Sequence, residues 1–494
     1  MTKVAAVIRA DHAAEAERQS RMALENGADL VELRFDYVRD LGSSTIRKLA
    51  NDVGTRAIAT FRSPVQGGAS GADPRQRMTI LREICRARFA YVDLELETDR
   101  EDLGSLGRLA SGHRTKVIVS HHFAQAAEAH RVSDTLDSCG AEGEIAKVAV
   151  PVTGFDEAVQ LVDLVRSRSG RPHRFVLIGM GAAGIATRAL ADSLGQEFQY
   201  ASWGPSAAPG QLSLRTASRL RGHEPIILGL IGHPVEHSIS STMHEAALDA
   251  LGLSAVYLLF DIPPEGLDRF LLAAERLRIR GFNVTSPHKE AVARSVDELD
   301  GDAERLGVVN TVVLRDGWTI GHNTDVYGFR VSLRSLGLRV GDRNALVVGA
   351  GGAAKAVVDV LLREGAHVQL TNRTAARADA LAESFDDQIE VLPPGVLTRK
   401  GPWDLLVNAT PAGTKGVPDG LPVPEAVIAN AGFIYDLVYN PFVTPLLRTA
   451  KRLSRPAASG LEMLLHQGAK AFELWMGQTA PFDAMQRAAK EALR

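Results

Sequence analysis

Short apolar runs alternate with amphipathic stretches over roughly the first 215 residues. Eight such runs lie at Val4–Arg9, Leu30–Phe35, Arg56–Arg62, Tyr91–Leu96, Lys116–His122, Ile145–Val150, Phe175–Met180 and Phe198–Trp203. Short apolar runs separated by amphipathic stretches are typical of buried strands that alternate with helices. The pattern therefore predicts an α/β fold and favours a closed parallel (β/α)8 TIM barrel, with a doubly wound open sheet as the alternative.

A second series of strands and helices follows a basic, polar segment, Ser218–Pro225, which we expect to be a linker. Its apolar runs lie at Ile226–Gly232, Val256–Ile262 and Gly281–Ser286. The pattern restarts at Asn344–Lys355 with a strand, a glycine turn and a helix start, and Gly460–Trp475 has the apolar period of a helix.

Length and composition limit the function classes. A chain of 494 residues is too long for one ordinary core, so we expect two to four domains. The formal net charge is −3, without a long basic run, and no apolar run reaches the roughly 18 residues of a membrane helix. Cys85 and Cys139 do not make a disulfide framework. We expect a cytoplasmic protein without a signal peptide, a nucleic-acid partner or a membrane partner.

Polar residues cluster towards the ends of the first eight runs. They are Glu32, Arg34, Arg62, Glu95, His122 and Lys147. In a (β/α)8 barrel the C-terminal strand ends form the active site, so these side chains should meet. Lys147 is unusual because it interrupts an apolar run. It either extends its ammonium to the strand end or is a desolvated, neutral amine that attacks a carbonyl.

A glycine turn in the second half fits a dinucleotide fingerprint. Gly349-x-Gly351-x-x-Ala354 follows a predicted strand and opens a predicted helix. About twenty residues further on, the next strand ends in Asn372-Arg-Thr-Ala-Ala-Arg377. Arg373 and Arg377 replace the acidic residue that binds a ribose hydroxyl of NAD, which favours NADP. The alternatives are a tight turn without a ligand and a solvated basic helix start.

Hydroxyl, amide and charged side chains recur along the second half. They are Ser238, Ser240, Asn283, Thr285, Lys289, Asn310 and Asp325. Each alone could be a cap or turn residue. As a set they suit a polyhydroxylated, anionic small molecule.

The segment from about residue 226 to the end resembles shikimate dehydrogenase. The motifs are His-Ser238-Ile-Ser240, Asn283-Val-Thr-x-Pro-His-Lys289, Val-Asn310-Thr, Asn-Thr-Asp325, Gly-Ala-Gly-Gly-Ala353, Asn372-Arg-Thr, Asn408-Ala-Thr-Pro, Tyr439-Asn-Pro and Gly460-Leu-x-Met-Leu-x-x-Gln467. The resemblance implies reduction of 3-dehydroshikimate to shikimate by NADPH, with Lys289 and Asp325 as the catalytic pair. The residues that it implies for substrate binding are Ser238, Ser240, Thr285, Asn310, Tyr439 and Gln467. Those that it implies for cofactor binding are Gly349, Ala350, Gly351, Gly352, Ala353, Asn372, Arg373, Thr374, Arg377 and Asn408.

Residues 1–215 resemble type I 3-dehydroquinate dehydratase. The motifs are Glu32-Leu-Arg34-Phe-Asp36, Thr60-Phe-Arg62, Asp93-Leu-Glu95, Ser120-His-His122, Ile-Ala-Lys147-Val-Ala, Arg188 and Ala-Pro-Gly-Gln211. The resemblance implies that Lys147, partly neutral because it is desolvated, forms a Schiff base with 3-dehydroquinate and that a histidine moves the protons. Arg188 would clamp the substrate carboxylate. Arg62 is a further implied substrate residue, Glu32, Arg34 and Gln211 would contact hydroxyls, and Met180 would wall the pocket.

Three details of this first half depart from the pattern or leave a choice. The gapless match selects His122 as the general base, with His121 as the fallback, and adjacent strand residues point to opposite faces. A metal site on the two histidines is not expected. Gln66 replaces the usual acid, so we expect a lower pKa for the general histidine. An extra alanine follows Ser206, which puts its contact with substrate in doubt.

The two resemblances share one compound, since the product of the first reaction is the substrate of the second. They predict a bifunctional enzyme with a dehydratase barrel at 1–217, a substrate-binding domain at 226–332 completed by helices at 458–494, and a Rossmann NADP domain at 333–457. A homodimer through the barrel is possible. The alternatives are a catabolic quinate/shikimate dehydrogenase that uses NAD and a non-catalytic metabolite sensor. For the barrel alone, a class I aldolase would also use a buried lysine.

Overall fold

A barrel of eight parallel strands forms the first part of the chain. The computed structural model describes residues 2–97, 99–168, 174–204, 210–236, 238–417 and 420–493. The strands run in the order β7-β6-β5-β4-β3-β2-β1-β8. They span β1 Lys3–Ile8, β2 Leu30–Arg34, β3 Ala57–Thr60, β4 Tyr91–Glu95, β5 Lys116–His122, β6 Ile145–Pro151, β7 Arg174–Met180 and β8 Phe198–Ser202.

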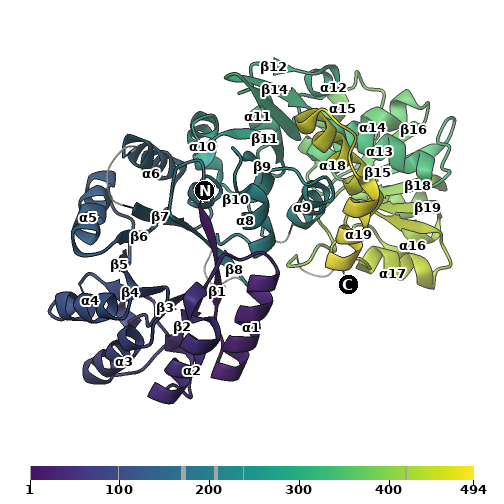
Figure 1. Ribbon diagram of the computed structural model, residues 1–494. Helices are drawn as coiled ribbons and strands as arrows, with labels where there is room; N and C mark the ends of the chain where they lie inside the picture. Colours follow the sequence, from purple (N-terminus) through teal and green to yellow (C-terminus); the bar gives the residue numbers. More distant parts are fainter. Residues whose placement is uncertain are drawn as a thin grey trace. The chain divides into compact units, whose positions relative to one another are not determined.

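Helices cover the outside of these strands (Figure 1). They are α1 Ala13–Glu25, α2 Ser43–Val53, α3 Pro74–Arg86, α4 Leu103–Gly112, α5 Ala129–Glu142, α6 Phe155–Ser167, α7 Ile185–Ala189 and α8 Leu214–Leu220. Between β7 and β8 the backbone amide of Glu197 donates to the carbonyl of Phe175 at 3.0 Å, which brings the two sheet edges together. Every strand contributes to one interior apolar cluster, from Ala5 on β1 to Tyr200 on β8. The prediction of a (β/α)8 barrel is confirmed, and the open sheet is excluded.

The predicted linker begins too early. Ser218 and its neighbours up to Leu220 belong to helix α8, whose residues Leu214, Ala217 and Leu220 are buried. The basic composition of this stretch suggested an exposed segment, but its apolar residues recur at helical spacing and pack inwards.

A second sheet has six strands of mixed direction, in the order β10-β9-β11-β13-β14-β12. They span β9 Ile226–Gly232, β10 Ala255–Asp261, β11 Ile279–Val284, β12 Glu298–Leu299, β13 Thr311–Arg315 and β14 Trp318–His322. The helices of this part are α9 Ser240–Ala250, α10 Leu267–Ala274, α11 Lys289–Ala293, α12 Gly301–Leu306 and α13 Thr324–Ser335, with α18 Leu461–Met476 and α19 Phe482–Ala492 from the C-terminal end. Trp475 on α18 donates its indole N–H to the carbonyl of Val312 at 2.9 Å. Helix α18 is thereby fixed to β13.

The third sheet is parallel and doubly wound. Its order, β17-β16-β15-β18-β19-β20, is the 3-2-1-4-5-6 order of dinucleotide-binding folds. The strands span β15 Asn344–Val348, β16 His367–Thr371, β17 Glu390–Val391, β18 Trp403–Asn408, β19 Ala431–Asp436 and β20 Ala457–Ser459. The helices are α14 Gly352–Arg363, α15 Ala375–Glu383, α16 Glu425–Ala429 and α17 Pro445–Arg452. In this order, ligands bind beyond the C-terminal end of β15, where the order of strands reverses.

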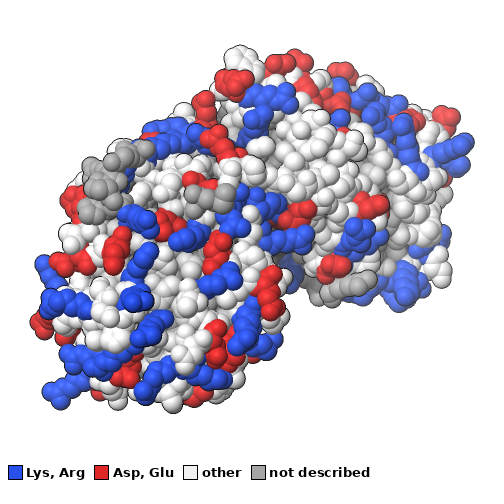
Figure 2. All heavy atoms as spheres, in the orientation of Figure 1, with Lys and Arg blue, Asp and Glu red and all other residues white. Residues whose placement is uncertain are grey.

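Two compact units are distinguished by their internal contacts. One comprises Met1–Ile227, Gly252–Phe260 and Gly266–Ile279, and the other comprises Leu228–Leu251, Asp261–Glu265 and Arg280–Arg494. Basic and acidic side chains are intermixed over the face that Figure 2 shows. None of the described helices is long and apolar enough to cross a membrane. The predicted boundaries of the three domains stay a prediction.

Candidate functional site

Lys147 lies inside the barrel on β6, between two carboxylates from other strands. Its ammonium is 3.0 Å from Glu32 Oε1 on β2 and 3.0 Å from Asp93 Oδ2 on β4. The ammonium also lies 4.0 Å from the centre of the Tyr200 ring on β8. Only 3% of the lysine side chain is exposed. The side chain therefore points into the barrel and does not extend to solvent.

The free enzyme holds this lysine in its charged form. Burial alone lowers the pKa of Lys147, but the carboxylates of Asp93 and Glu32 outweigh burial and raise that pKa above its ordinary value. The prediction that desolvation leaves Lys147 partly neutral is wrong, because two anions accompany the lysine into the interior. A reaction that uses the neutral amine must first remove a proton.

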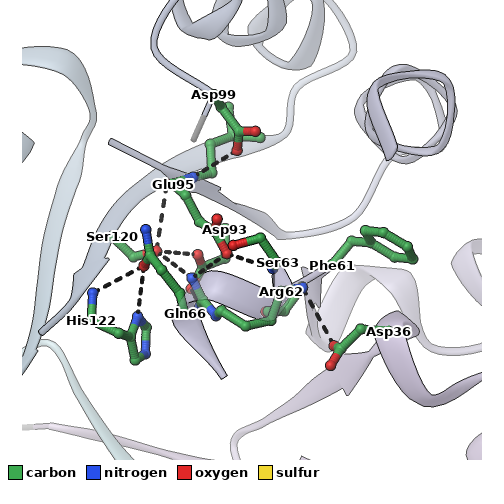
Figure 3. A network of polar contacts seen from close by, with 12 residues as sticks. Asp36, Phe61, Arg62, Ser63, Gln66, Asp93, Glu95, Asp99, Ser120 and His122 are labelled. Carbon is green, nitrogen blue, oxygen red and sulfur yellow. Dashed lines mark hydrogen bonds and ion pairs between the residues drawn. The ribbon is translucent and has the colours of Figure 1, made fainter. Parts of the chain in front are cut away.

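Asp93 is the centre of a buried polar network (Figure 3). Its carboxylate accepts from Arg62 at 2.9 Å and from Ser120 at 2.5 Å, besides Lys147. Arg62 also binds Glu95 at 3.2 Å. Burial by itself raises the pKa of Asp93, but Arg62 and Lys147 hold that pKa well below its usual range. Arg62, predicted as a substrate ligand, is engaged by carboxylates in the free enzyme.

His122 and His121, at the end of β5, have different surroundings. Gln66 Oε1, from the β3–α3 loop, accepts from the backbone N–H of His122 at 3.0 Å and lies 3.3 Å from its Nδ1 (Figure 3). Burial and then the charges of Arg62 and Lys147 hold the pKa of His122 well below its usual range. The His121 ring instead packs edge-on against Phe123. His122 is the histidine whose charge is coupled to Lys147, which favours the predicted choice.

Arg188 is buried on α7 without a carboxylate partner among the residues that the structure describes. It is 7% exposed, and its Nε donates to the carbonyl of Gly179 at 3.3 Å. Burial lowers the pKa of Arg188 to about 10. A desolvated, unpaired guanidinium is costly, and an anionic ligand would compensate it.

The other residues predicted to contact substrate in the barrel differ in their burial and in their partners. Arg34 makes a two-point ion pair with Asp36, at 2.8 and 2.7 Å. Met180 is half-buried at the end of β7, and Gln211 is half-buried after the last strand. Ser206 lies outside the described residues, so the doubt about its contact with substrate stays open.

Lys289 and Asp325 form a direct pair in the second unit. The ammonium of Lys289, at the start of α11, lies 2.5 Å from Asp325 Oδ2 on α13. The amide of Asn310 donates to Asp325 Oδ1 at 2.9 Å and lies 3.4 Å from Gln467 Oε1 on α18. Asn323 caps α13 by accepting from Val326 N, which fixes the turn that carries Asp325. The structure thus brings four predicted residues together.

Other predicted substrate residues surround the loop after β9. Tyr439 forms a hydrogen bond with Ser238, and the backbone N–H of Ser240 donates to Ser238 Oγ at 3.2 Å. Thr285 packs against Gly232, where an added Cβ would lie 2.3 Å from the threonine methyl group. The glycine therefore permits the close approach of the two loops.

The glycine turn has the geometry that a dinucleotide requires. Gly349 has φ +112°, and a Cβ there would lie 2.9 Å from Thr410 and 3.0 Å from Ala409. A Cβ at Gly351 would meet no atom within 4 Å, so space remains above the start of α14. The first backbone N–H groups of this helix point to that space, as phosphate binding needs. A Cβ at Gly352 would lie 3.2 Å from Lys289, so the turn adjoins the predicted catalytic pair.

The end of β16 offers two exposed cations. Arg373 and Arg377 are exposed, and neither has an ion pair within the described part of the chain. The Asn372 side chain donates to the carbonyl of Thr374 at 2.8 Å and shapes the turn. These residues suit a ribose 2′-phosphate, as predicted from the missing acid.

Asn408 is the last residue of β18. It is fully buried, donates to Asp436 at 2.8 Å and accepts from Thr410 Oγ1 at 2.6 Å. Its cofactor contact stays a prediction, and the buried side chain favours an indirect role. Asn408 shapes the loop that packs against Gly349.

Sequence reasoning missed Asp93, Ser120 and Tyr200 as members of the lysine site. Asp93 and Ser120 stood in the quoted motifs, and charged or hydroxyl residues inside apolar runs are a detectable signal. No comparable signal marked Tyr200, since aromatic residues are common in strands. Within the described residues, no group of three or more His, Cys, Asp or Glu side chains could hold a metal ion.

Comparison with known proteins decides the family. The shikimate dehydrogenase (NADP(+)) of Archaeoglobus fulgidus is 42% identical over 272 residues, which cover 54% of this chain and 99% of that protein. The chain belongs to the shikimate dehydrogenase family. Residues 230–312 match the model of the shikimate dehydrogenase substrate binding domain, 332–414 that of shikimate / quinate 5-dehydrogenase, and 460–490 that of the shikimate 5'-dehydrogenase C-terminal domain.

The barrel matches the model of a second family. Residues 4–222 match the model of type I 3-dehydroquinase. A solved shikimate dehydrogenase in complex with NADP+ is 38% identical, covers 55% of this chain and 96% of its own, and has a TM-score of 0.52. A solved dehydroquinate dehydratase and shikimate dehydrogenase from S. pombe is 25% identical over 99% of this chain and 98% of its own, with a TM-score of 0.45. The predicted bifunctional shikimate-pathway enzyme, a lyase joined to an oxidoreductase, is confirmed.

Proposed function

We propose that the barrel dehydrates 3-dehydroquinate through a Schiff base on Lys147 and that the second unit reduces the product to shikimate with NADPH. The observation that carries this proposal is the lysine itself. It is buried inside the barrel between two carboxylates, its charge acts on His122, and the same barrel holds a buried arginine, Arg188, without a carboxylate partner among the described residues. These are the groups that carbonyl attack, proton transfer and carboxylate binding require.

In the barrel, Lys147 attacks the C3 carbonyl and water leaves, which gives an iminium. The iminium withdraws electrons, so the C2 proton becomes acidic and His122 removes it. The same proton then goes to the departing hydroxyl, which leaves as water as the double bond forms. Hydrolysis of the iminium returns the free lysine and 3-dehydroshikimate.

The charges around Lys147 support this order of reaction steps. The iminium carries the same single positive charge as the ammonium, so Glu32 and Asp93 stabilise both. Arg188 is the proposed partner of the substrate carboxylate, because its guanidinium is buried and has no carboxylate partner among the described residues. Arg34, Arg62, Gln211 and Met180 remain proposed contacts to the rest of the ring.

In the second unit, NADPH supplies a hydride to the ketone of 3-dehydroshikimate. Lys289 donates the proton that the developing alkoxide needs, and its positive charge stabilises that oxygen. Asp325, 2.5 Å from the ammonium, orients Lys289. Ser238, Ser240, Thr285, Asn310, Tyr439 and Gln467 are the proposed ligands of the substrate hydroxyls and carboxylate.

The choice of NADPH rests on the second basic turn. Arg373 and Arg377 are exposed beside the glycine turn, and the relative from A. fulgidus is named as NADP(+)-dependent. The matching family model also names quinate, so reduction of 3-dehydroquinate is the second candidate activity of this unit. The two arginines favour NADP as its cofactor as well. A cytoplasmic location and a homodimer through the barrel remain predictions.

Two single-site measurements test the assignments. Sodium borohydride added with 3-dehydroshikimate should reduce the Schiff base, and the added mass should appear on the peptide that contains Lys147. An unmodified Lys147 peptide at saturating ligand would contradict the barrel mechanism. In the second unit, Lys289→Ala should lower kcat for NADPH oxidation by roughly 100-fold or more, and Lys400→Ala, at an exposed lysine, should not.

A further inference from the structure

The two carboxylates that bind Lys147 have different partners. Asp93 is bound by Arg62 at 2.9 Å and by Ser120 at 2.5 Å, as well as by the lysine. Glu32 is bound through Oε1 by Lys147 at 3.0 Å and by the hydroxyl of Thr60 at 3.0 Å. Within the described part of the chain, Glu32 has no arginine at ion-pair distance. If Lys147 gives up its proton, Asp93 keeps Arg62 at ion-pair distance, whereas Arg34 and Arg62 act on Glu32 only from farther away.

Asp93 is therefore a poor acceptor for the lysine proton. Protonating Asp93 would neutralise the nearer of the two anions that compensate Arg62, whose side chain is 3% exposed. The pKa of Asp93 already lies well below its usual range, because Arg62 and Lys147 outweigh the effect of burial. Its role is to keep a fixed negative charge beside the nitrogen.

His122 is a poor acceptor at the same step. Burial and then the charges of Arg62 and Lys147 hold its pKa well below the usual range. The lysine ammonium donates to Glu32 and to Asp93, each at 3.0 Å, and none of its hydrogen bonds within the described residues reaches His122.

We propose that Glu32 is the acid–base residue of Schiff-base formation, taking a proton from Lys147 and returning it to the carbonyl oxygen that leaves as water. This inference rests on the proposed Schiff-base function of the barrel. Glu32 can both accept and return the proton, because the Thr60 hydroxyl can donate to its carboxylate and can accept from its carboxylic acid.

The step balances in atoms and charge. One proton moves from the ammonium to Glu32, and the neutral amine attacks C3 to form the C–N bond. The nitrogen still carries two protons, and one of them passes to the former carbonyl oxygen, which gives a neutral carbinolamine. The proton on Glu32 is then delivered to that hydroxyl, the C–O bond breaks with its electron pair, and water leaves. The products are an iminium and a Glu32 carboxylate, so the charge beside Asp93 is unchanged overall.

Glu32→Gln separates this role from a purely electrostatic one. Glutamine keeps the shape and can bind the lysine, but it cannot carry the proton. If Glu32 served only as an anion that keeps Lys147 protonated, its removal would release neutral amine and speed the trapping reaction. If Glu32 shuttles the proton, the rate of borohydride trapping with 3-dehydroshikimate should fall about 100-fold or more. The two roles thus predict opposite signs.

The experiment follows the rate of mass addition at Lys147 in the full chain at fixed pH. Glu142→Gln, which removes the same charge from the exposed end of α5, should trap like the unchanged protein. Trapping of Glu32→Gln as fast as the unchanged protein, or faster, overturns the inference. Failure of the unchanged protein to trap overturns the proposed barrel function instead.

A second variant guards against misfolding. Glu32→Asp retains a carboxylic acid on a shorter side chain and should recover part of the trapping rate that Glu32→Gln loses. If the loss came from a packing defect alone, restoring an acid would not raise the rate. If Glu32→Asp and Glu32→Gln trap at equal rates while their circular dichroism and thermal midpoints match those of the unchanged protein, the shuttle role is excluded.

Discussion

Gln66 holds His122 through both its backbone and its ring: one amide oxygen lies 3.0 Å from the backbone nitrogen and 3.3 Å from Nδ1. An uncharged amide orients the ring but adds no negative charge beside it. Burial and then the charges of Arg62 and Lys147 outweigh the opposing charge of Asp93 and keep the pKa of His122 low. The histidine stays neutral, and able to accept a proton, well into the acidic range.

Gln66→Glu should shift the pH dependence of the dehydratase. A carboxylate this close to Nδ1 stabilises the imidazolium and raises the pKa of His122 by about 1–3 units. The base must be neutral to act, so the acidic limb of the kcat/KM profile should move to higher pH by a similar amount. Gln76→Glu, on the exposed first turn of α3, is the matched control and should leave the limb in place. An unshifted limb in Gln66→Glu would count against His122 as the base.

Arg188→Met should weaken substrate binding and raise the thermal stability of the free protein. Losing the partner of a buried carboxylate costs about 2–5 kcal/mol, so kcat/KM for 3-dehydroquinate should fall by at least about 30-fold. Without ligand, the thermal midpoint should rise, because burial of the unpaired guanidinium destabilises the charged form. Scanning calorimetry with and without 3-dehydroshikimate measures both effects.

Arg168→Met provides the comparison, because that buried arginine is paired with Asp137 at 2.9 Å. Its replacement should lower the thermal midpoint. A lower midpoint for Arg188→Met as well would show that Arg188 has a structural partner, and it would remove the argument for a substrate clamp.

Asp93→Asn should destabilise the barrel in a pH-dependent way. Arg62 and Lys147 depress the folded-state pKa of Asp93, although burial opposes them, so its stabilising contribution is present above the unfolded pKa of about 3.9 and declines as the pH falls towards the folded value. Breaking this buried set should cost about 3–5 kcal/mol at pH 7 and less at pH 3. Urea unfolding at the two pH values measures the difference, with the exposed Asp102→Asn as control. An equal cost at both pH values would contradict the assigned charge.

Arg373→Ala should weaken NADPH selectively. Removing a charge-assisted hydrogen bond to a phosphate costs about 1.5–3 kcal/mol, so KM for NADPH should rise roughly 10- to 100-fold. KM for NADH should change little, since NADH lacks the 2′-phosphate, and Arg399→Ala at another exposed arginine should change neither. A parallel rise of both KM values would place Arg373 elsewhere in the site.

Local patterns predicted the framework of both halves. The apolar run at Lys116–His122 coincides with β5, and that at Ile226–Gly232 coincides with β9. Both could be predicted because a short, continuous apolar run is typical of a strand that is buried on both faces. Lys289 and Asp325 could be paired from their motifs. The charge of Lys147 could not be predicted, because it depends on Glu32 and Asp93, which are 115 and 54 residues away in sequence. Likewise, the burial of Asn408 depends on its long-range partner Asp436.

The most direct test is a coupled assay of the purified full chain with 3-dehydroquinate, in which NADPH absorbance is followed beside Lys147→Ala and Lys289→Ala. The account predicts that the unchanged protein oxidises NADPH and forms shikimate as the carbon product. Lys147→Ala should oxidise NADPH rapidly only when 3-dehydroshikimate is supplied, and Lys289→Ala should accumulate enone absorbance without oxidising NADPH. Product analysis separates shikimate from quinate. If the unchanged protein neither dehydrates 3-dehydroquinate nor reduces 3-dehydroshikimate, the account is wrong.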